Sequence, residues 1–150
     1  MSNITSNASC NPSSISVSGK TSGSGTISWS LPTVPAGGVI NSCKLTGTCT
    51  VSDTGNKPAT VTVNGTSVSS GVAFTIDLGT GNTTSSVAVA ATGPHKNTSS
   101  TITFSNLVYT VTYAIYHTVT FVDWDGTVLK TQQVEEGTCI FMRSCSSNCY

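Results

Sequence analysis

Apolar and polar residues alternate with a period of two through most of the chain, which predicts β-strands rather than helices. In the first clear example, Ile27, Trp29 and Leu31 alternate with serines before Pro32. Further alternating segments, separated by turn-forming residues, cover 39–51, 59–68, 74–78, 87–90 and 101–115. No window shows helical periodicity. Roughly seven to nine short strands predict an all-β fold, an antiparallel β-sandwich of jelly-roll or immunoglobulin-like topology.

The boundaries of this sandwich follow from composition and turn chemistry. Residues 1–26 are rich in Ser, Asn and Gly, so we expect an extended arm there and the sandwich over 27–115. Asn64-Gly65 separates two short alternating runs and predicts a hairpin with a type I′ turn. A change of phase around Ser105-Asn106 indicates a bulge or kink in the last long strand.

A second hairpin is predicted over 116–138. Residues alternate from Thr118 to Asp123, Asp125-Gly126 favours a turn, and Thr127–Val134 returns. A two-stranded hairpin alone is marginally stable in water. It must therefore pack on the sandwich or be completed by another copy or a partner, and we favour contact with other chains. Residues 139–150 follow as a cysteine-bearing tail.

The low content of charged residues and their balance limit which partners the protein can have. Charged residues make up only 8% of the 150 residues, and six acids balance six Lys and Arg, whereas an ordinary soluble domain has about 25%. Without a basic excess or a basic amphipathic helix we expect no nucleic acid partner and no membrane insertion. The first residues lack the features of a secretory signal. We therefore expect release by lysis or within a particle if the sequence is complete, or removal of the signal if it is a fragment.

Six cysteines are many for a cytosolic enzyme. On one continuous strand Cys43 and Cys49 would lie about 20 Å apart, too far to bridge, whereas a turn at Thr46-Gly47-Thr48 would let them meet. The three cysteines of the tail lack a CxxC pair and a nearby His, which favours disulfides or free thiols over zinc. We expect no metal and no cofactor. The candidate disulfide or crosslink positions are Cys43, Cys49, Cys139, Cys145 and Cys149.

The hairpin turn also resembles a catalytic motif. Asp123-Trp124-Asp125-Gly126-Thr127 looks like the nucleophile loop of haloacid-dehalogenase-type phosphatases. Those enzymes need a parallel α/β sheet and later Lys and acidic residues that hold phosphate and Mg²⁺. Only 23 of the 150 residues follow Thr127, and they contain no amphipathic helix. No Ser or Cys lies in a recognisable nucleophile motif either. We therefore expect a hairpin, no enzyme and no catalytic residue.

The aromatic residues separate into a predicted core and a predicted contact. Trp29, Tyr109 and Tyr113 alternate with polar residues, so we expect them to line the sandwich interior rather than a sugar-stacking platform. Trp124 lies between two acids at the hairpin turn and is expected to be exposed. The candidate ligand or partner contacts are Asp123, Trp124 and Asp125.

Two resemblances extend this interpretation. Residues 26–114, with SWSLPTVPAGGVINSCKLTGT, VTVNGTSV, FTIDLG and TITFSNLVYTVTY, resemble jelly-roll-type sandwich modules of phage structural proteins and bacterial surface proteins. YHTVTFVDWDGTVLKTQQVEEGT, at 116–138, resembles the start of the internalin-type B repeat, a small β-grasp module of surface adhesins and some phage proteins. The usual continuation of that repeat is absent, and CIFMRSCSSNCY stands in its place.

The resemblances imply a non-enzymatic structural or adhesive protein on a virion surface. We expect a bacteriophage decoration, head-fibre or tail-associated protein that stabilises the particle or attaches it to a host surface. Its expected partners are other virion proteins and copies of itself, with a host-surface glycan or protein as a further contact. The alternatives are a carbohydrate-binding or adhesin module of a bacterial surface protein, or an extracellular filament subunit whose hairpin completes a neighbour's sheet.

Overall fold

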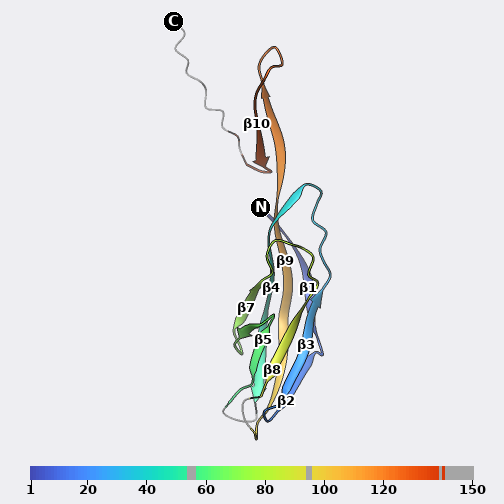
Figure 1. Ribbon diagram of the computed structural model, residues 1–150, viewed down its shortest axis with the longest axis vertical. Coiled ribbons are helices and arrows are strands. Elements are labelled where there is room, and N and C mark those ends of the chain that lie inside the picture. Colours follow the sequence, from blue (N-terminus) through green and yellow to red (C-terminus); the bar gives the residue numbers. More distant parts are fainter. Residues whose placement is uncertain (54–56, 94–95, 139, 141–150) are drawn as a thin grey trace.

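The computed structural model describes residues 1–53, 57–93, 96–138 and 140 (Figure 1). The described residues form strands, turns and loops without a helix, and none therefore forms a helix long and apolar enough to span a membrane. The prediction of an all-β fold is confirmed. The strands are β1 Ser2–Asn11, β2 Ser14–Ser18, β3 Ser22–Trp29, β4 Gly38–Asp53, β5 Thr60–Val63, β6 Thr66–Val68, β7 Ala73–Asp77, β8 Ser86–Thr92, β9 Ser99–Val122 and β10 Val128–Glu135.

The strands form an antiparallel sandwich of two layers that share β1. One layer has the order β7-β4-β9-β1, and in it β2 pairs with the first residues of β9, ahead of those that pair with β1. The second layer has the order β6-β5-β8-β3-β1. β1 belongs to both because Ser2–Asn7 pairs with β9 whereas Ala8–Asn11 pairs with β3. The layers close around one core (Figure 1).

The core follows from the period-two alternation, because every second residue of a strand faces the opposite layer. Both layers contribute fully buried side chains, and the outward positions carry mostly Ser, Thr and Asn. The turn predicted at Asn64-Gly65 is confirmed, since both residues have positive φ (49° and 77°) as a type I′ turn requires. Asn106 also has a positive φ of 52°, at the predicted kink. The largest fully buried side chains are those of Ile27, Cys43, Leu45, Cys49, Val63, Val89, Ile102, Tyr109 and Val111.

The predicted extended arm at 1–26 is wrong, because these residues form β1, β2 and most of β3. Ile15 and Val17 are buried in the core, and Ile4, Ala8 and Cys10 pack against it. Ser- and Asn-rich segments can form strands when neighbouring strands satisfy their backbone groups and water meets their outward side chains. Composition alone carries no information about that pairing.

Of the two alternatives for Cys43 and Cys49, the structure has the continuous strand, so the turn at Thr46-Gly47-Thr48 and the candidate Cys43–Cys49 disulfide do not form. β4 runs through these residues with only a register shift against β9, and both cysteines are buried free thiols. Gly47 serves packing instead: a Cβ there would lie 2.6 Å from Leu107 Cδ2 and 3.0 Å from Phe74 Cζ. Glycine is required by close approach of side chains, not by a reversal of the chain. The predicted crosslinks at Cys139, Cys145 and Cys149 lie outside the described residues.

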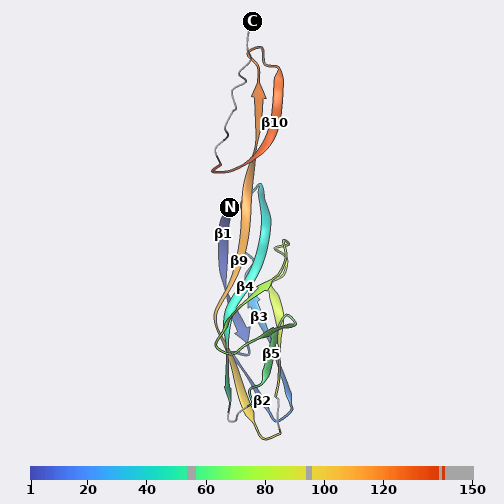
Figure 2. The same ribbon diagram turned by 90° about the vertical axis from the view of Figure 1, so that its left-hand side faces the viewer.

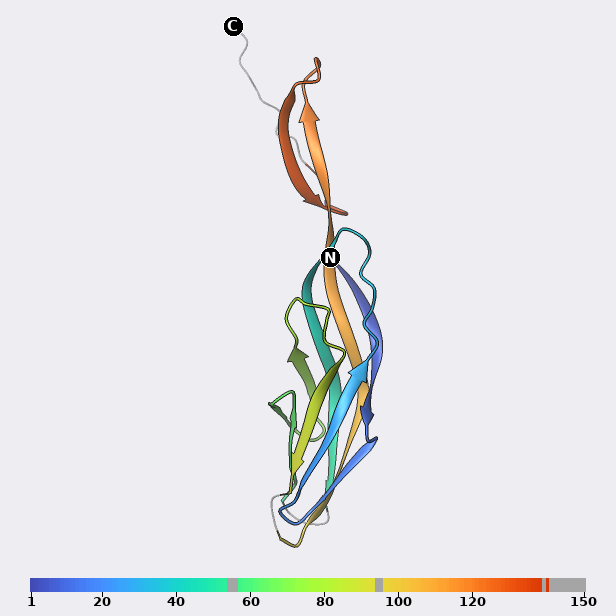
Figure 3. The same cartoon turned by 45° about the vertical axis from the view of Figure 1, so that its right-hand side comes forward.

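The predicted C-terminal hairpin extends the sandwich along its length. β9 is 24 residues long, and its last part, Tyr116–Val122, leaves the sandwich and pairs with β10. The ribbon projects from the end of the sandwich at which the N-terminus lies (Figures 1 and 2). The molecule is therefore elongated, with the hairpin at one end and, at the other, the turn between β2 and β3 beside the start of β9 (Figure 3).

Candidate interaction site at the hairpin tip

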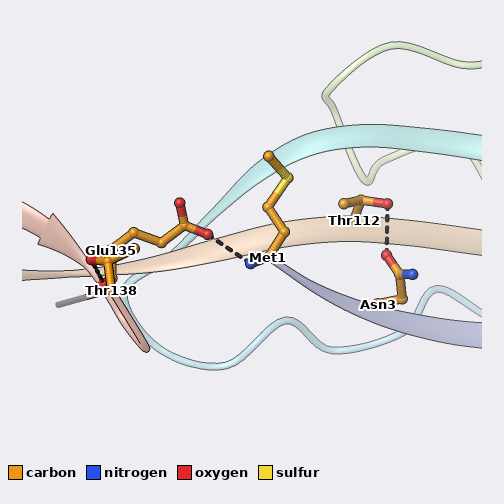
Figure 4. A network of polar contacts seen from close by, with 5 residues as sticks. All are labelled: Met1, Asn3, Thr112, Glu135 and Thr138. Carbon is orange, nitrogen blue, oxygen red and sulfur yellow. Dashed lines mark hydrogen bonds and ion pairs between the residues drawn. The ribbon is translucent and has the colours of Figure 1, made fainter.

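The base of the hairpin is tied to the start of β1. The backbone N–H of Glu136 donates to the Ile115 carbonyl at 2.8 Å. The Met1 ammonium group lies 2.7 Å from Glu135 Oε1 and forms an ion pair with it (Figure 4). Nearby, Thr112 Oγ1 donates to Asn3 Oδ1 at 2.8 Å between β9 and β1 (Figure 4). These contacts support the base of the ribbon and leave the rest of it without support from the sandwich.

No side chain of 116–138 is buried. Cross-strand partners share a face of the ribbon, so Val119 and Phe121 lie on one face with Gln132 and Lys130. Val119 and Phe121 are only half-buried, because a ribbon of two strands has no second layer to cover them. The hairpin is therefore folded but uncovered.

The two acids of the tip hold the turn closed. Asp123 Oδ1 accepts from the Trp124 N–H, and Asp125 Oδ1 accepts from the Thr127 N–H, both at 2.8 Å. Hydrogen bonds from Thr127, through its side chain and its backbone N–H, hold the pKa of the Asp125 carboxyl below its ordinary value. Gly126 supplies the positive φ of 86° that the turn requires. The turn predicted at Asp125-Gly126 is confirmed.

This turn presents Trp124 to solvent with 93% of its surface exposed, as predicted. Exposed apolar residues flank it: Val122 at 56%, Val128 at 59% and Leu129 at 65%. We call Val122, Trp124, Val128 and Leu129 the tip cluster. Scattered apolar residues are normal on a surface, whereas several together indicate an interaction site. Tryptophan is also one of the residues enriched among energetically dominant interface contacts.

The charges are divided between the two parts of the chain. Residues 116–138 contain four of the six acids and one lysine, which gives −4 + 1 = −3 with His117 neutral. Residues 1–115 contain two acids and four lysines, which gives −2 + 4 = +2. Arg143 of the tail supplies the remaining +1, so the net charge of zero combines an acidic hairpin with a basic sandwich.

Two of the three predicted interior aromatics, Trp29 and Tyr109, lie in the core, whereas Tyr113 is half-buried and lies outside it. Trp29 is 7% exposed and Tyr109 fully buried, and their rings stack with centroids 4.7 Å apart. The Tyr109 hydroxyl donates to Asn82 Oδ1 at 2.9 Å, and Asn82 Nδ2 donates to the Pro32 carbonyl at 2.7 Å. Burial, followed by the interaction with Cys43, raises the pKa of Tyr109. These rings stabilise the sandwich and present no sugar-stacking face.

The remaining ionisable side chains include the residue types that bind metal ions and the thiols that can react as nucleophiles. In the described ranges no three His, Cys, Asp or Glu side chains gather into a metal site. Burial raises the pKa of the Cys10 and Cys49 thiols, with a smaller contribution at Cys49 from Cys10. A raised pKa lowers the thiolate fraction and with it the reactivity of both groups.

Two hollows of the sandwich were not predicted from the sequence. One, of about 300 Å³, opens between β4 and the β5–β6 hairpin. The other, of about 260 Å³, lies where β1 leaves β9, beside Phe104 and Leu107. Both depend on where neighbouring strands stop pairing, which no local sequence pattern reports.

No protein-family model matches the chain, and no match was found among the curated proteins or the solved structures.

Proposed function

We propose that the chain is a non-enzymatic structural or adhesive protein of a virus particle, acting as a bacteriophage decoration, head-fibre or tail-associated protein. The observation that carries the proposal is the projecting hairpin, whose tip exposes 93% of Trp124 beside three further exposed apolar residues. The sandwich presents this hairpin, and the partner covers it.

The energetics of the ribbon support a partner. A lone two-stranded hairpin is marginal in water, and no side chain of this one is buried. Covering a large apolar side chain contributes about 1.5–3 kcal/mol, so burial of the tip cluster by a partner would stabilise both the contact and the hairpin. The site accordingly fits a surface that a partner covers in an assembly.

The sandwich suits a display role. Its outward positions carry mainly uncharged hydroxyl and amide groups, and its charged residues are few. Such a surface gives weak long-range electrostatics, so partner choice falls to the shape and apolar contacts of particular sites. We assign the principal contact to Trp124, with Asp123 and Asp125 fixing its orientation.

Binding to purified phage particles tests the proposal. The native chain, Trp124→Ala and the control Val39→Ala, which removes an apolar side chain 52% exposed on the sandwich, are titrated onto particles stripped of this protein. We expect the native chain and the control to saturate a defined number of sites. Trp124→Ala should bind at least about tenfold more weakly, the effect of about 1.4 kcal/mol.

Two outcomes contradict the proposal. Absence of the native protein from immunogold-labelled particles, together with no binding to stripped ones, would exclude a virion role. Equal loss of binding in Trp124→Ala and Val39→Ala would exclude the hairpin tip as the contact.

A further inference from the structure

The larger hollow is an apolar groove on the open side of the sandwich. β7 pairs with β4 only as far as Thr48, so β4 continues beyond its neighbour. Where β7 is missing, Val51 N–H donates to Ser70 Oγ at 2.9 Å. The groove of about 300 Å³ lies between this part of β4 and the other layer. Its floor is formed by Val51, Pro58, Ala59, Val61 and Val68.

The groove lies in the part of the sandwich farthest from the hairpin. Thr60, at its rim, pairs with Thr92, which pairs with Ser22, the first residue of β3. The turn that precedes β3 lies at the end of the molecule opposite the hairpin, which we call the distal end (Figure 3). Its other wall, at Val51, pairs with Ile102 near the start of β9. The hairpin instead follows the opposite end of β9. The tip cluster and the groove are therefore at opposite ends of one elongated molecule.

The distal end is basic. Lys57 directly precedes Pro58 of the groove floor. Lys20 and Lys96 lie on two turns that meet, since a Cβ on Gly19 would contact the Lys96 carbonyl oxygen at 3.4 Å. Asp53 lies at the same end and accepts a hydrogen bond from Ser100 Oγ at 2.8 Å. With three lysines and this one acid, the described residues of the end carry +3 − 1 = +2.

The two ends are complementary in charge and in shape. The hairpin presents an exposed indole between two carboxylates, and the groove presents an apolar floor beside a lysine. About 300 Å³ is the lower limit of the range of about 300–1,000 Å³ for ligand pockets. The groove therefore suits one large side chain better than an oligosaccharide. An aromatic anchor buried in a pocket is a common form of a dominant interface contact.

We propose that Trp124 of one copy inserts into this groove of a second copy, so that the protein assembles head to tail. Donor and acceptor surfaces differ and lie at opposite ends, so the contact is heterologous and each added copy leaves one tip and one groove free. The product is a linear or helical filament. The inference rests on the proposed function in using the hairpin tip as the contact, and it identifies a second copy of the chain as the partner.

Two complementary variants test this arrangement. Trp124→Ala removes the tip and keeps the groove, whereas Ser69→Trp fills the groove from its exposed serine rim and keeps the tip. We expect light scattering, with reductant present, to show the native mass rising between about 1 µM and about 1 mM, as for small interfaces. Each variant alone should stay at 15.3 kDa. An equimolar mixture should form a complex of two chains and grow no further.

The controls are matched to each change. Val39→Ala and Thr75→Trp alter exposed positions on the sandwich away from both sites, and both should associate like the native chain. Raising the salt to about 1 M should weaken native association, because exposed opposite charges are screened. Urea unfolding confirms that each variant is folded. Ser67→Trp, at another exposed position of the groove rim, replaces Ser69→Trp if that variant fails this check.

The outcomes separate this inference from the proposed function. A native chain that stays monomeric up to about 1 mM, or a mixture that forms no two-chain complex, overturns head-to-tail assembly. Self-association of either variant alone overturns it too, because a symmetric contact would then exist. If, in addition, particles bind Ser69→Trp normally and Trp124→Ala poorly, the proposed function stands and only the self-contact fails.

Discussion

The two tryptophans of this chain provide a direct comparison, because replacement by alanine should lower the free energy of unfolding strongly at Trp29 and very little at Trp124. Trp29 is 7% exposed and stacks on Tyr109 at a centroid distance of 4.7 Å, whereas Trp124 is 93% exposed. Replacing a buried Trp by Ala costs about 3–5 kcal/mol, from lost burial and the cavity left behind. An exposed replacement changes stability by about 0.5 kcal/mol or less.

A third variant separates ring packing from the polar group. Among the described residues, no group accepts a hydrogen bond from the buried Trp29 Nε1–H. Trp29→Phe keeps a ring against Tyr109 and removes this N–H, so no hydrogen bond within the protein is lost with it. We expect Trp29→Phe to cost less than half as much as Trp29→Ala.

Urea unfolding followed by far-UV circular dichroism, at about 1 µM so that contacts between chains are negligible, measures these differences. With a slope of about 2 kcal/mol per M, Trp29→Ala should lower the midpoint by about 1.5–2.5 M and Trp124→Ala by less than about 0.3 M. Each Ala variant also leaves one tryptophan as a fluorescent reporter, since the chain has two.

Two results would refute this reasoning. A cost above about 2 kcal/mol for Trp124→Ala would mean that this ring packs within its own chain and is not free for a partner. A cost below about 1 kcal/mol for Trp29→Ala would mean that the Trp29–Tyr109 stack is not part of the core.

Three further predictions concern packing, pH and thiol reactivity. Gly47→Ala should destabilise the sandwich by about 1–3 kcal/mol through overpacking, whereas Gly81→Ala, whose Cβ would meet only Thr83 Oγ1 at 3.6 Å, should have little effect on the urea midpoint. Because the folded pKa of Asp125 is lowered, its contribution to the turn is present above the ordinary Asp pKa of about 3.9 and is lost as the pH falls through the lowered value. Protection of the native turn amides, measured as exchange relative to the intrinsic rate at each pH, should therefore fall at acid pH, and Asp125→Asn, already lacking this contribution, should show no such loss of protection. Alkylation mapped by mass spectrometry should modify the buried Cys43 and Cys49 only at the rate of unfolding; rapid modification in native buffer would contradict their burial.

The predictions that succeeded rest on local chemistry. Alternation assigns the strands, and Asn64-Gly65 and Asp125-Gly126 need the positive φ that their turns adopt. The exposure of Trp124 followed from its place in a two-stranded turn. In each case a few consecutive residues contain the decisive information.

The predictions that failed depend on pairing between distant residues. β1 forms because β9 and β3, far along the chain, supply hydrogen-bonding partners for a Ser- and Asn-rich segment. The sequence left a turn at Gly47 open, whereas Leu107 and Phe74 occupy the space that a side chain there would need. The groove beside Val51 exists because β7 stops pairing at Thr48, which the sequence of β4 does not show.

Hydrogen exchange of the hairpin amides, compared between the dilute chain and the assembled or particle-bound chain, tests the central claim most directly. We expect amides of Tyr116–Val122 and Val128–Glu135 to exchange rapidly in the dilute chain, because no layer covers the ribbon, while the β4–β9 amides are protected. On assembly the hairpin amides nearest the tip should become protected and the core amides should stay unchanged. A hairpin already as protected as the core in the dilute chain, or one that gains no protection on assembly, would contradict the account.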